Sequence, residues 1–376
     1  MVENVKPFMN IGPGEAIREE LEIRNWQQGD LAEVLGMSKK FVNELIMSKK
    51  PITVETARLL SKAFGQSPQY WLNFDIMYRL REKHDTDRAK EVEEKAKIFK
   101  YMPVKEMVKK GWFKPYTTLK ELKRQVLSFW NIKSLDFSFM EDVELPGFKP
   151  VDLSLNYNKY YALCWYEMAK KNAKNFRTGN YDTDKLKELA ENFHSFLIKE
   201  SGVEEFISEL GETGIKFFVL RHLKKAFIDG ASFYDSYNPV IVYACRHDRI
   251  DMFWFTMAHE ISHILLHLNK ENYFLDNLEL LETEMQQEAK DLAVKMLKVE
   301  EIMNYFKTRE YQSYISEPRV VYCKEELQLD SAIIAGVLQH YGKMSKKNLN
   351  RFKKSVSNLI PEKFFVEGKT FISANR

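Results

Sequence analysis

Cysteine, long apolar runs and an excess of one charge are all scarce in this chain of 376 residues. The three cysteines, Cys164, Cys245 and Cys323, are far apart and form no C-x-x-C motif. They indicate neither a disulfide framework nor a thiolate metal site, and they favour a reducing cytoplasm. No apolar run reaches the roughly 18 residues that a transmembrane helix needs, so we expect no membrane partner.

The N-terminus and the net charge argue against two further classes of protein. Residues 1–10, M-V-E-N-V-K-P-F-M-N, contain no apolar core of signal-peptide length. The net charge of +3 is too small to indicate a nucleic-acid partner by itself, so such a partner has to be argued from local charge. With 44% hydrophobic and 30% charged residues, the composition is that of a soluble globular protein. The length predicts two or three domains.

A histidine-rich segment carries the strongest chemical signal. Residues 256–267 read T-M-A-H-E-I-S-H-I-L-L-H, in which His259, Glu260 and His263 form an H-E-x-x-H motif. Residues four apart lie on one face of a helix, so both histidines can direct a ring nitrogen at one zinc ion. Glu260 lies next to that face and can act as the catalytic base that takes a proton from water activated by the metal.

The flanks of this motif predict a buried helix. Three of the eight histidines, including His267, fall within nine residues at helical spacing, and no proline interrupts the run. We interpret His267 as a structural neighbour of the site and not as a ligand. The alternative is a core helix whose histidines only form hydrogen bonds to their neighbours. Apolar cover comes from Phe253, Trp254, Phe255, Met257, Ile264, Leu265, Leu266 and Leu268.

Five short amphipathic segments follow one another in the first part of the chain. We expect Gly36 to end the second segment, and Ser38 and Thr53 to cap the third and the fourth. A helix, a three-residue turn that contains glycine and a second helix form a helix-turn-helix. The segments cover residues 14–23, 27–35 and 39–47, then a fourth that ends near residue 64 and a fifth that opens at Pro68.

The expected helix-turn-helix presents polar side chains on its third segment. Residues 1–80 hold ten Lys or Arg and ten Asp or Glu, so basic charge is concentrated only locally. The alternative is a small helical bundle that makes protein contacts. The predicted core is Ala32, Val34, Leu35, Val42, Leu45 and Ile46. The predicted contacts to the phosphates and base edges of double-stranded DNA are Gln28, Ser38, Lys39, Lys40, Phe41, Asn43, Lys49 and Lys50.

Three runs in this part resemble the HigA/VapI class of helix-turn-helix antitoxins. Residues 28–38 read Q-G-D-L-A-E-V-L-G-M-S, residues 48–57 read S-K-K-P-I-T-V-E-T-A, and residues 67–73 read S-P-Q-Y-W-L-N. The resemblance covers about residues 10–82. It implies a DNA-binding repressor that recognises a pseudo-palindromic operator as a homodimer, and it brings a toxin among the expected protein partners.

Residues 85–215 are expected to form a helical connector or sensing segment. Helical patterns recur along it, and a loop is expected at residues 144–158. His194 lies among apolar neighbours, so we interpret it as a packed core residue. No catalytic constellation is found in this segment.

A small β-sheet is expected before the motif helix. Residues 214–220 and 239–244 are β-branched and aromatic runs bounded by turn formers, and residues 231–234 can add a third strand. This order is found in zincin proteases, whose edge strand binds an extended peptide by adding it to the sheet. The expected fold class is mainly α with a small β-sheet (α+β): an N-terminal helix-turn-helix bundle, a helical middle segment and a C-terminal zincin-like domain.

Four runs of the C-terminal part resemble the ImmA/IrrE-type metallopeptidases fused behind a HigA-like domain. They are G-A-S-F-Y at 230–234, P-V-I-V at 239–242, D-M-F-W-F-T-M-A-H-E-I-S-H-I-L-L-H at 251–267 and I-I-A-G-V-L-Q-H at 333–340. Together with the N-terminal runs, the match spans nearly the whole chain. It implies zinc as the cofactor and a role in cleaving or controlling repressors.

The third zinc ligand is the open point of the predicted site. A catalytic zinc site needs three protein ligands and one open position, and the resembled family supplies a glutamate from the following helix. Strict register puts Gln286 in that place, and glutamine is a poor zinc ligand. Glu284 and Glu288 flank it, and we favour Glu288. The alternative is that both are solvated carboxylates of a degenerate protease. His340 and Tyr341 are candidate oxyanion donors.

The sequence therefore predicts a cytoplasmic DNA-binding regulator that carries a zinc-dependent endopeptidase domain acting on a regulatory protein. In this hypothesis His259, His263 and Glu288 hold zinc, while Glu260 accepts a proton and passes it to the leaving amine. The alternative is a repressor or antitoxin whose degenerate protease-like domain senses a partner or signal. The expected domains are residues 1–84, 85–215 and 216–376.

Overall fold

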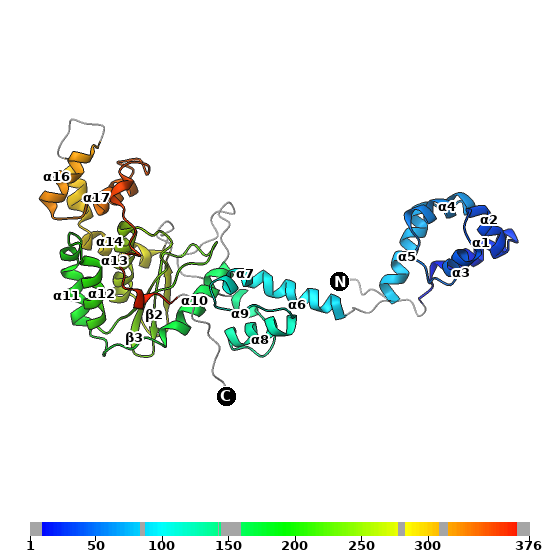
Figure 1. The fold of residues 1–376 in the computed structure, drawn as a ribbon, viewed down its shortest axis with the longest axis horizontal. Coiled ribbons are helices and arrows are strands. Elements are labelled where there is room, and N and C mark those ends of the chain that lie inside the picture. The colour runs from blue at the N-terminus through cyan, green and yellow to red at the C-terminus, as the bar shows by residue number, and fades with distance from the viewer. Residues whose placement is uncertain are drawn as a thin grey trace. The chain divides into compact units, whose positions relative to one another are not determined.

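The structure is a computed structural model, and it describes residues 10–82, 87–141, 143, 159–276, 283–307 and 315–366. The chain divides into two compact units, Met1–Glu94 and Lys95–Arg376, and many of their helices and strands are labelled in Figure 1. No helix within the described ranges is long and apolar enough to cross a membrane. The loop predicted at residues 144–158 lies outside the described residues.

The first unit is built from helices that surround one small core. Its first five helices match the five predicted segments, and a sixth helix runs across the boundary between the units. The helices are α1 (Pro13–Arg24), α2 (Gln28–Leu35), α3 (Lys39–Ile46), α4 (Val54–Phe64), α5 (Pro68–Glu82) and α6 (Asp87–Tyr101).

Helices α2 and α3 form the predicted helix-turn-helix. Gly36 ends α2 with a φ of 64°, a left-handed conformation that costs glycine little because it has no Cβ. The Ser38 hydroxyl caps α3 by accepting a hydrogen bond from the Phe41 amide at 3.1 Å. Thr53 caps α4 by accepting one from the Thr56 amide at 3.2 Å. The three predicted helix ends are therefore confirmed.

The predicted core of the helix-turn-helix is confirmed with one exception. Val34 is 52% exposed, whereas the other five predicted residues are buried. The buried stripe of α2 is formed by Leu31, Ala32 and Leu35. Val34 lies beside this stripe, on the part of the helix surface that is open to solvent, so the prediction for it is wrong.

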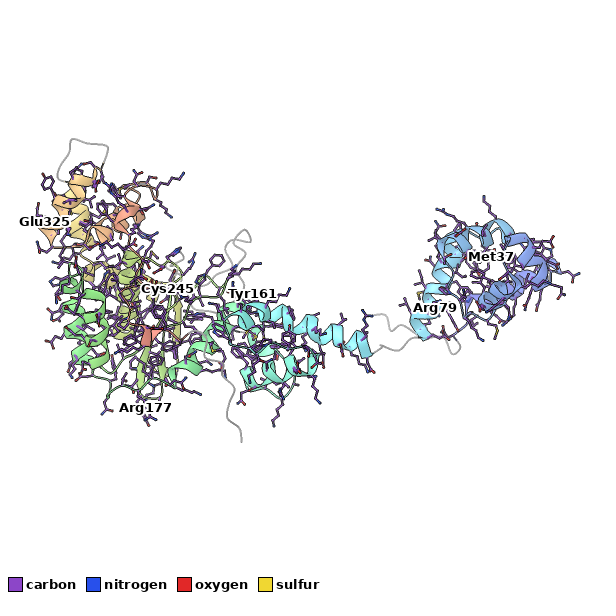
Figure 2. The ribbon with its side chains drawn as sticks, in the orientation of Figure 1. Met37, Arg79, Tyr161, Arg177, Cys245 and Glu325 are labelled. Carbon is purple, nitrogen blue, oxygen red and sulfur yellow. The ribbon has the colours of Figure 1, made fainter. Side chains whose placement is uncertain are left out.

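A buried carboxylate on α5 fixes the segment between α3 and α4. Asp75 is 3% exposed and accepts a hydrogen bond from the Ile52 amide at 3.1 Å. The Nε atom of Arg79, labelled in Figure 2, lies 2.9 Å from both carboxylate oxygens of Asp75. Its Nη2 donates to the Ser48 carbonyl at 3.1 Å. A buried charge that is paired in this way holds its neighbours in one geometry. The backbone on either side of Lys49 and Lys50 is therefore held against the helices.

The second unit combines one small sheet with many helices, the α+β class that the sequence predicted. The strands are β1 (Lys216–Val219), β2 (Gly230–Asp235), β3 (Asn238–Tyr243) and β4 (Tyr273–Asp276). The helices after α6 are α7 (Val104–Lys109), α8 (Leu119–Trp130), α9 (Ser138–Glu141), α10 (Lys159–Ala173), α11 (Thr183–Glu191), α12 (Gly202–Glu212), α13 (Ile250–Leu266), α14 (Glu284–Met296), α15 (Val299–Lys307), α16 (Glu317–Leu327) and α17 (Ser331–His340). Short 3₁₀ helices lie at Phe193–Phe196, Asn350–Phe352 and Glu362–Phe364.

The four strands form one mixed sheet in the order β1-β3-β2-β4. β1 runs parallel to β3, and β2 runs antiparallel to both β3 and β4. The three predicted strands are confirmed. β4 was not predicted, because a strand of four residues is too short to show a clear two-residue period. In the β2–β4 ladder, Gly230 is paired with Asp276.

Helices cover both faces of the sheet. Successive residues of β1 alternate between two cores, because side chains along a strand point to opposite faces: Phe217 and Val219 belong to one core and Phe218 to the other. Residues of α11–α17 complete the first core, and residues of α6–α10 complete the second. The helices expected as a separate middle segment at residues 85–215 thus pack on the sheet, and the boundary between compact units falls after residue 94.

Candidate functional site

Helix α13 carries the H-E-x-x-H motif and is deeply buried in the second unit. His259 is 2% exposed, and Glu260 and His263 are 0% exposed. The helix packs against α14, α17 and strand β2. The apolar residues of α13 pack into the core that it shares with the other helices of α11–α17. The two motif histidines instead lie beside Asp276 of β4 and Gln286 of α14.

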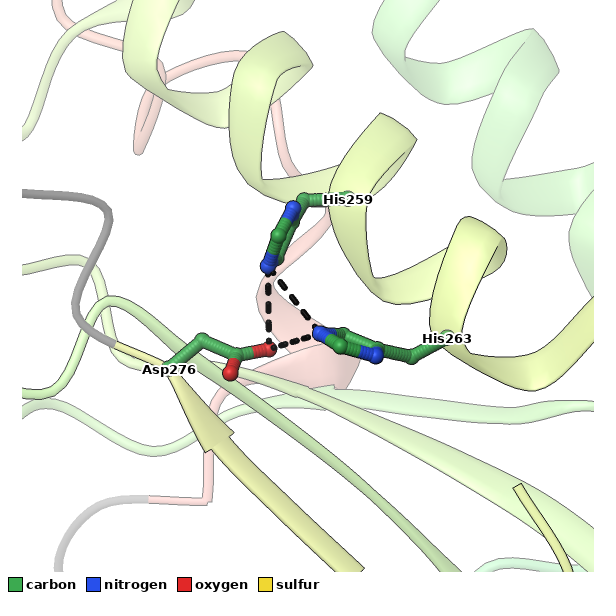
Figure 3. A group of neighbouring side chains, drawn as sticks. All are labelled: His259, His263 and Asp276. Carbon is green, nitrogen blue, oxygen red and sulfur yellow. Dashed lines mark hydrogen bonds and ion pairs between the residues drawn. The ribbon is translucent and has the colours of Figure 1, made fainter. Parts of the chain in front are cut away.

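Two histidines and an aspartate converge on one point, as Figure 3 shows. The Nε2 atoms of His259 and His263 are 3.1 Å apart. The Oδ2 atom of Asp276 lies 3.5 Å from the first of these nitrogens and 3.3 Å from the second. Asp276 reaches this point because β4 pairs with β2, the strand that packs against α13. Imidazole and carboxylate are both ligands that zinc accepts.

The three atoms have the spacing of a tetrahedral metal site. Ligand atoms about 2.0–2.1 Å from a tetrahedral zinc ion lie about 3.3–3.4 Å from one another. The observed separations of 3.1, 3.3 and 3.5 Å bracket that value. Buried polar atoms normally have hydrogen-bond partners, but among the described residues Asp276 Oδ2 accepts no hydrogen bond. The donor set therefore fits a zinc ion.

Gln286 on α14 orients this group. Its amide nitrogen donates to Asp276 Oδ1 at 2.6 Å. Its Oε1 lies 2.9 Å from His259 Nε2 and 3.4 Å from His263 Nε2. The structure thus places Gln286 beside the histidines, as the register of the sequence indicated. Because its amide nitrogen donates to the aspartate, the amide oxygen faces the histidines. This oxygen carries no charge and is a weak ligand at most.

Burial keeps the His263 ring neutral. Its pKa is lowered to about 4, chiefly because burial removes solvation; His259 and His267 contribute in the same direction, while Asp276 and the hydrogen bond with Gln286 oppose the shift. The ring also stacks on Phe274 of β4, with centroids 4.0 Å apart and planes inclined by 13°. A neutral imidazole held in one orientation presents its Nε2 lone pair, as a metal ligand must.

Glu260 is a buried carboxyl group next to the same centre. Burial raises its pKa well above the usual value, and the negative charge of Asp276 raises it further. A Cβ atom on Gly230 would lie only 2.3 Å from Glu260 Oε1 and 2.7 Å from Thr256 Cγ2. Glycine at this place on β2 therefore permits the close approach of helix and strand. A raised pKa makes the carboxylate a stronger base, which suits a group that accepts and returns a proton.

The structure does not bring Glu288 to the histidine pair. Its side chain is 56% exposed and lies 3.4 Å from His267 Nε2, beyond the two motif histidines. Glu284 is exposed at the first position of α14. Residues two apart on a helix point in nearly opposite directions, so neither glutamate shares the face of Gln286. The sequence analysis placed the third ligand on α14. The pattern in the sequence that could have pointed to Asp276 instead is only the short β-type run Y-F-L-D, which ends in a carboxylate.

The third helix of the first unit presents polar groups to solvent. Lys39, Lys40 and Asn43 are exposed, and their spacing places them on one side of α3. Three more of the predicted DNA contacts, Gln28, Ser38 and Lys49, lie outside this helix and are also exposed.

Phe41 and Lys50 interact with each other within the first unit. The Lys50 ammonium lies 5.0 Å from the centroid of the Phe41 ring and 3.7 Å from a Glu44 carboxylate oxygen. Phe41 is half-buried, whereas Lys50 is exposed. The cation over the aromatic ring therefore covers part of the surface that was predicted to meet DNA.

The two units define two classes of domain: a helix-turn-helix, and an α+β domain centred on an H-E-x-x-H helix. Family models agree with this division. A helix-turn-helix model matches residues 17–71, and the model of the IrrE N-terminal-like domain matches residues 198–317.

Relatives of the first unit include proteins that are named as transcriptional regulators. Virulence-associated protein I of Dichelobacter nodosus is 38% identical over 72 residues, which are 19% of this chain and 67% of that protein. The uncharacterized HTH-type transcriptional regulator YddM of Escherichia coli K12 is 32% identical over 74 residues, 20% of this chain and 79% of that protein. A crystal structure assigned as an antidote protein of a plasmid maintenance system from Nostoc punctiforme is 36% identical, with a TM-score of 0.19, over 19% of this chain and 79% of that one.

The chain therefore belongs to the helix-turn-helix family of regulators, and it carries an IrrE N-terminal-like domain behind its helix-turn-helix. Both families are those that the sequence runs resembled.

The variant Gly230→Ala is expected to displace Glu260 and destabilise the second unit, because the added methyl group overlaps the carboxyl group. We expect the free energy of unfolding to fall by about 2 kcal/mol, as for other overpacked buried sites. Urea unfolding followed by circular dichroism measures this change. Gly211→Ala on α12 is the control, because its added Cβ meets nothing within 4 Å and alanine suits a helix. Equal stability of the two variants would contradict the close contact.

Proposed function

We propose that this protein is a DNA-binding transcriptional regulator whose second unit is a zinc-dependent endopeptidase that acts on a regulatory protein. The observation that carries the enzymatic part is the convergence of His259, His263 and Asp276 beside the buried Glu260. The helix-turn-helix and its relatives support the regulatory part.

Each residue of the buried group has a role in this proposal. His259, His263 and Asp276 hold the zinc ion, which supplies Lewis-acid activation of water and of a peptide carbonyl when bound. Gln286 keeps the aspartate in place through its hydrogen bond of 2.6 Å. Glu260 accepts a proton from water and returns it to the leaving amine, and its raised pKa makes its carboxylate a stronger base for the first of these steps.

The sheet supports a peptide as the substrate. β4 lies at one end of the strand order, and within the described structure it pairs only with β2. An extended peptide can add to such an edge through main-chain hydrogen bonds. A peptide held along β4 would pass Asp276, the last residue of that strand, and would therefore lie beside the candidate metal centre.

The first unit is proposed to bind a double-stranded DNA operator in the cytoplasm, as a homodimer. The exposed Lys39, Lys40 and Asn43 support α3 as the helix that meets the major groove. Gln28 and Lys49 would contact the phosphate backbone. The protein partner is the substrate of the peptidase or a toxin that the regulator controls.

One observation favours a second candidate function. Gln286 is a neutral amide where the resembled peptidases have a ligand glutamate, and its oxygen already faces both histidines. In this alternative the second unit does not cleave peptides and instead senses a partner or a signal for the repressor. The two functions differ in whether the chemistry of Glu260 is needed.

The variant Glu260→Gln is expected to abolish peptide cleavage while leaving DNA binding unchanged. Removing a catalytic acid-base group lowers the rate roughly 10²- to 10⁴-fold. The assay incubates the zinc-supplemented full chain with a peptide pool from a digested bacterial proteome and identifies new ends by mass spectrometry. Glu209→Gln on the exposed face of α12 is the matched control. Cleavage that is equal in parent and Glu260→Gln, or absent from both, would favour the sensing function.

The variant Asn43→Ala is expected to weaken binding to DNA selected from a random library by about 1–3 kcal/mol and to relax its sequence preference. Lys39→Gln should weaken binding to all sequences and lower the salt dependence by about one phosphate contact. Fluorescence anisotropy at several salt concentrations measures both effects. Lys62→Gln, an exposed lysine on α4, is the control. If Asn43→Ala kept the parental affinity and the parental preference for DNA sequence, α3 would not be the helix that recognises the bases.

A further inference from the structure

A cavity of about 310 Å³ lies between α13, α14 and α17, and His259 forms part of its wall. This volume is at the lower end of the range for small-molecule sites. The cavity does not belong to the triad of His259, His263 and Asp276, because two of those three residues do not line it. The cavity therefore adjoins the candidate metal centre without enclosing it.

One side of the cavity is apolar. Met252 and Phe255 of α13 face it together with Val294 of α14 and Leu297, which follows that helix. The His340 ring lies 6.3 Å from the Phe255 ring, centroid to centroid, and extends this surface. A ring or a short apolar chain can bury its surface here.

The rest of the lining is strongly basic. Asp251 is the one carboxylate among the described lining residues, and two cations already neutralise it. Arg249 donates to its two oxygens at 3.0 and 2.6 Å, and the Lys353 ammonium lies 3.0 Å from Oδ2. Lys290 and Lys346 add two further positive charges to the wall.

The cations of this wall act on one another. Burial lowers the pKa of His340, and the charges of Lys290 and Lys346 lower it further. Burial also lowers the pKa of Lys353, with smaller contributions in the same direction from Arg249 and Lys346 and an opposing one from Asp251. Positive charges that repel one another around a partly desolvated cavity are relieved by an anion.

We infer that the cavity between α13, α14 and α17 binds a small organic anion, with its acid group between Lys290 and Lys346 and its apolar body against Met252 and Phe255. A carboxylate or a phosphate meets the chemistry of the acid group equally. This binding site goes beyond the peptidase and does not depend on it. A bound ligand would contact His259, so it would couple a small metabolite to the neighbouring centre.

The test titrates phenyl phosphate into the purified full-length chain by isothermal titration calorimetry. We expect saturable binding of one equivalent per chain, and binding about fivefold weaker in each of Lys290→Gln and Lys346→Gln. Lys295→Gln on α14 and Lys347→Gln, next to Lys346, are the matched controls and should keep the parental affinity, since neither lines the cavity.

Three further measurements distinguish binding in this cavity from binding to a metal ion and from nonspecific attraction of an anion or a ring. Benzyl alcohol carries the ring without the charge and should bind far more weakly than phenyl phosphate, as should inorganic phosphate, which carries the charge without the ring. His263→Ala should retain binding, because His263 does not line the cavity and an anion held by a metal ion would be lost with it. Equal affinities in the two lysine variants and their controls, loss of binding with His263→Ala, or no binding at millimolar phenyl phosphate would overturn the inference.

Discussion

The arrangement of the second unit depends on the hydrogen bond of 2.6 Å between the Gln286 amide and Asp276. This bond joins α14 to the end of β4, and both elements meet at the histidines of α13. Without it, Asp276 Oδ1 would lose the hydrogen bond from Gln286 in a buried site, and an unpartnered buried polar group is costly. With it, three ligand atoms lie at the separations that a tetrahedral ion requires.

This bond also shows how a glutamine can stand beside a metal centre. An amide can donate a hydrogen bond and a glutamate carboxylate cannot, so Gln286 can orient an aspartate where a glutamate would repel it. In the proposed zinc site, the ligand charge would then come from β4 and not from α14. Burial in the same place raises the pKa of Glu260, and the negative charge of Asp276 raises it further. Gly230 leaves room for Glu260, because any side chain there would meet the glutamate.

Much of the fold and part of the site were predictable from sequence, because the signals were local. Helix caps such as Ser38 depend on neighbouring residues, and the i, i+4 spacing of His259 and His263 fixes their common face. Val34 was wrongly placed in the core because an apolar residue beside a buried stripe looks like part of it. Asp276 could not be found, because its position depends on pairing between β2 and β4 across about forty residues of sequence, which no short pattern encodes.

The most direct test of the metal centre is the zinc content of the purified full-length chain, measured by elemental analysis after incubation with zinc and removal of the free metal. We expect nearly one zinc per chain in the parent and in Glu288→Gln, and little zinc in His263→Ala and Asp276→Asn. Circular dichroism of each variant shows whether it is folded. Zinc that is kept by Asp276→Asn and lost from Glu288→Gln would move the third ligand back to α14, and a parent without zinc would contradict the metal centre itself.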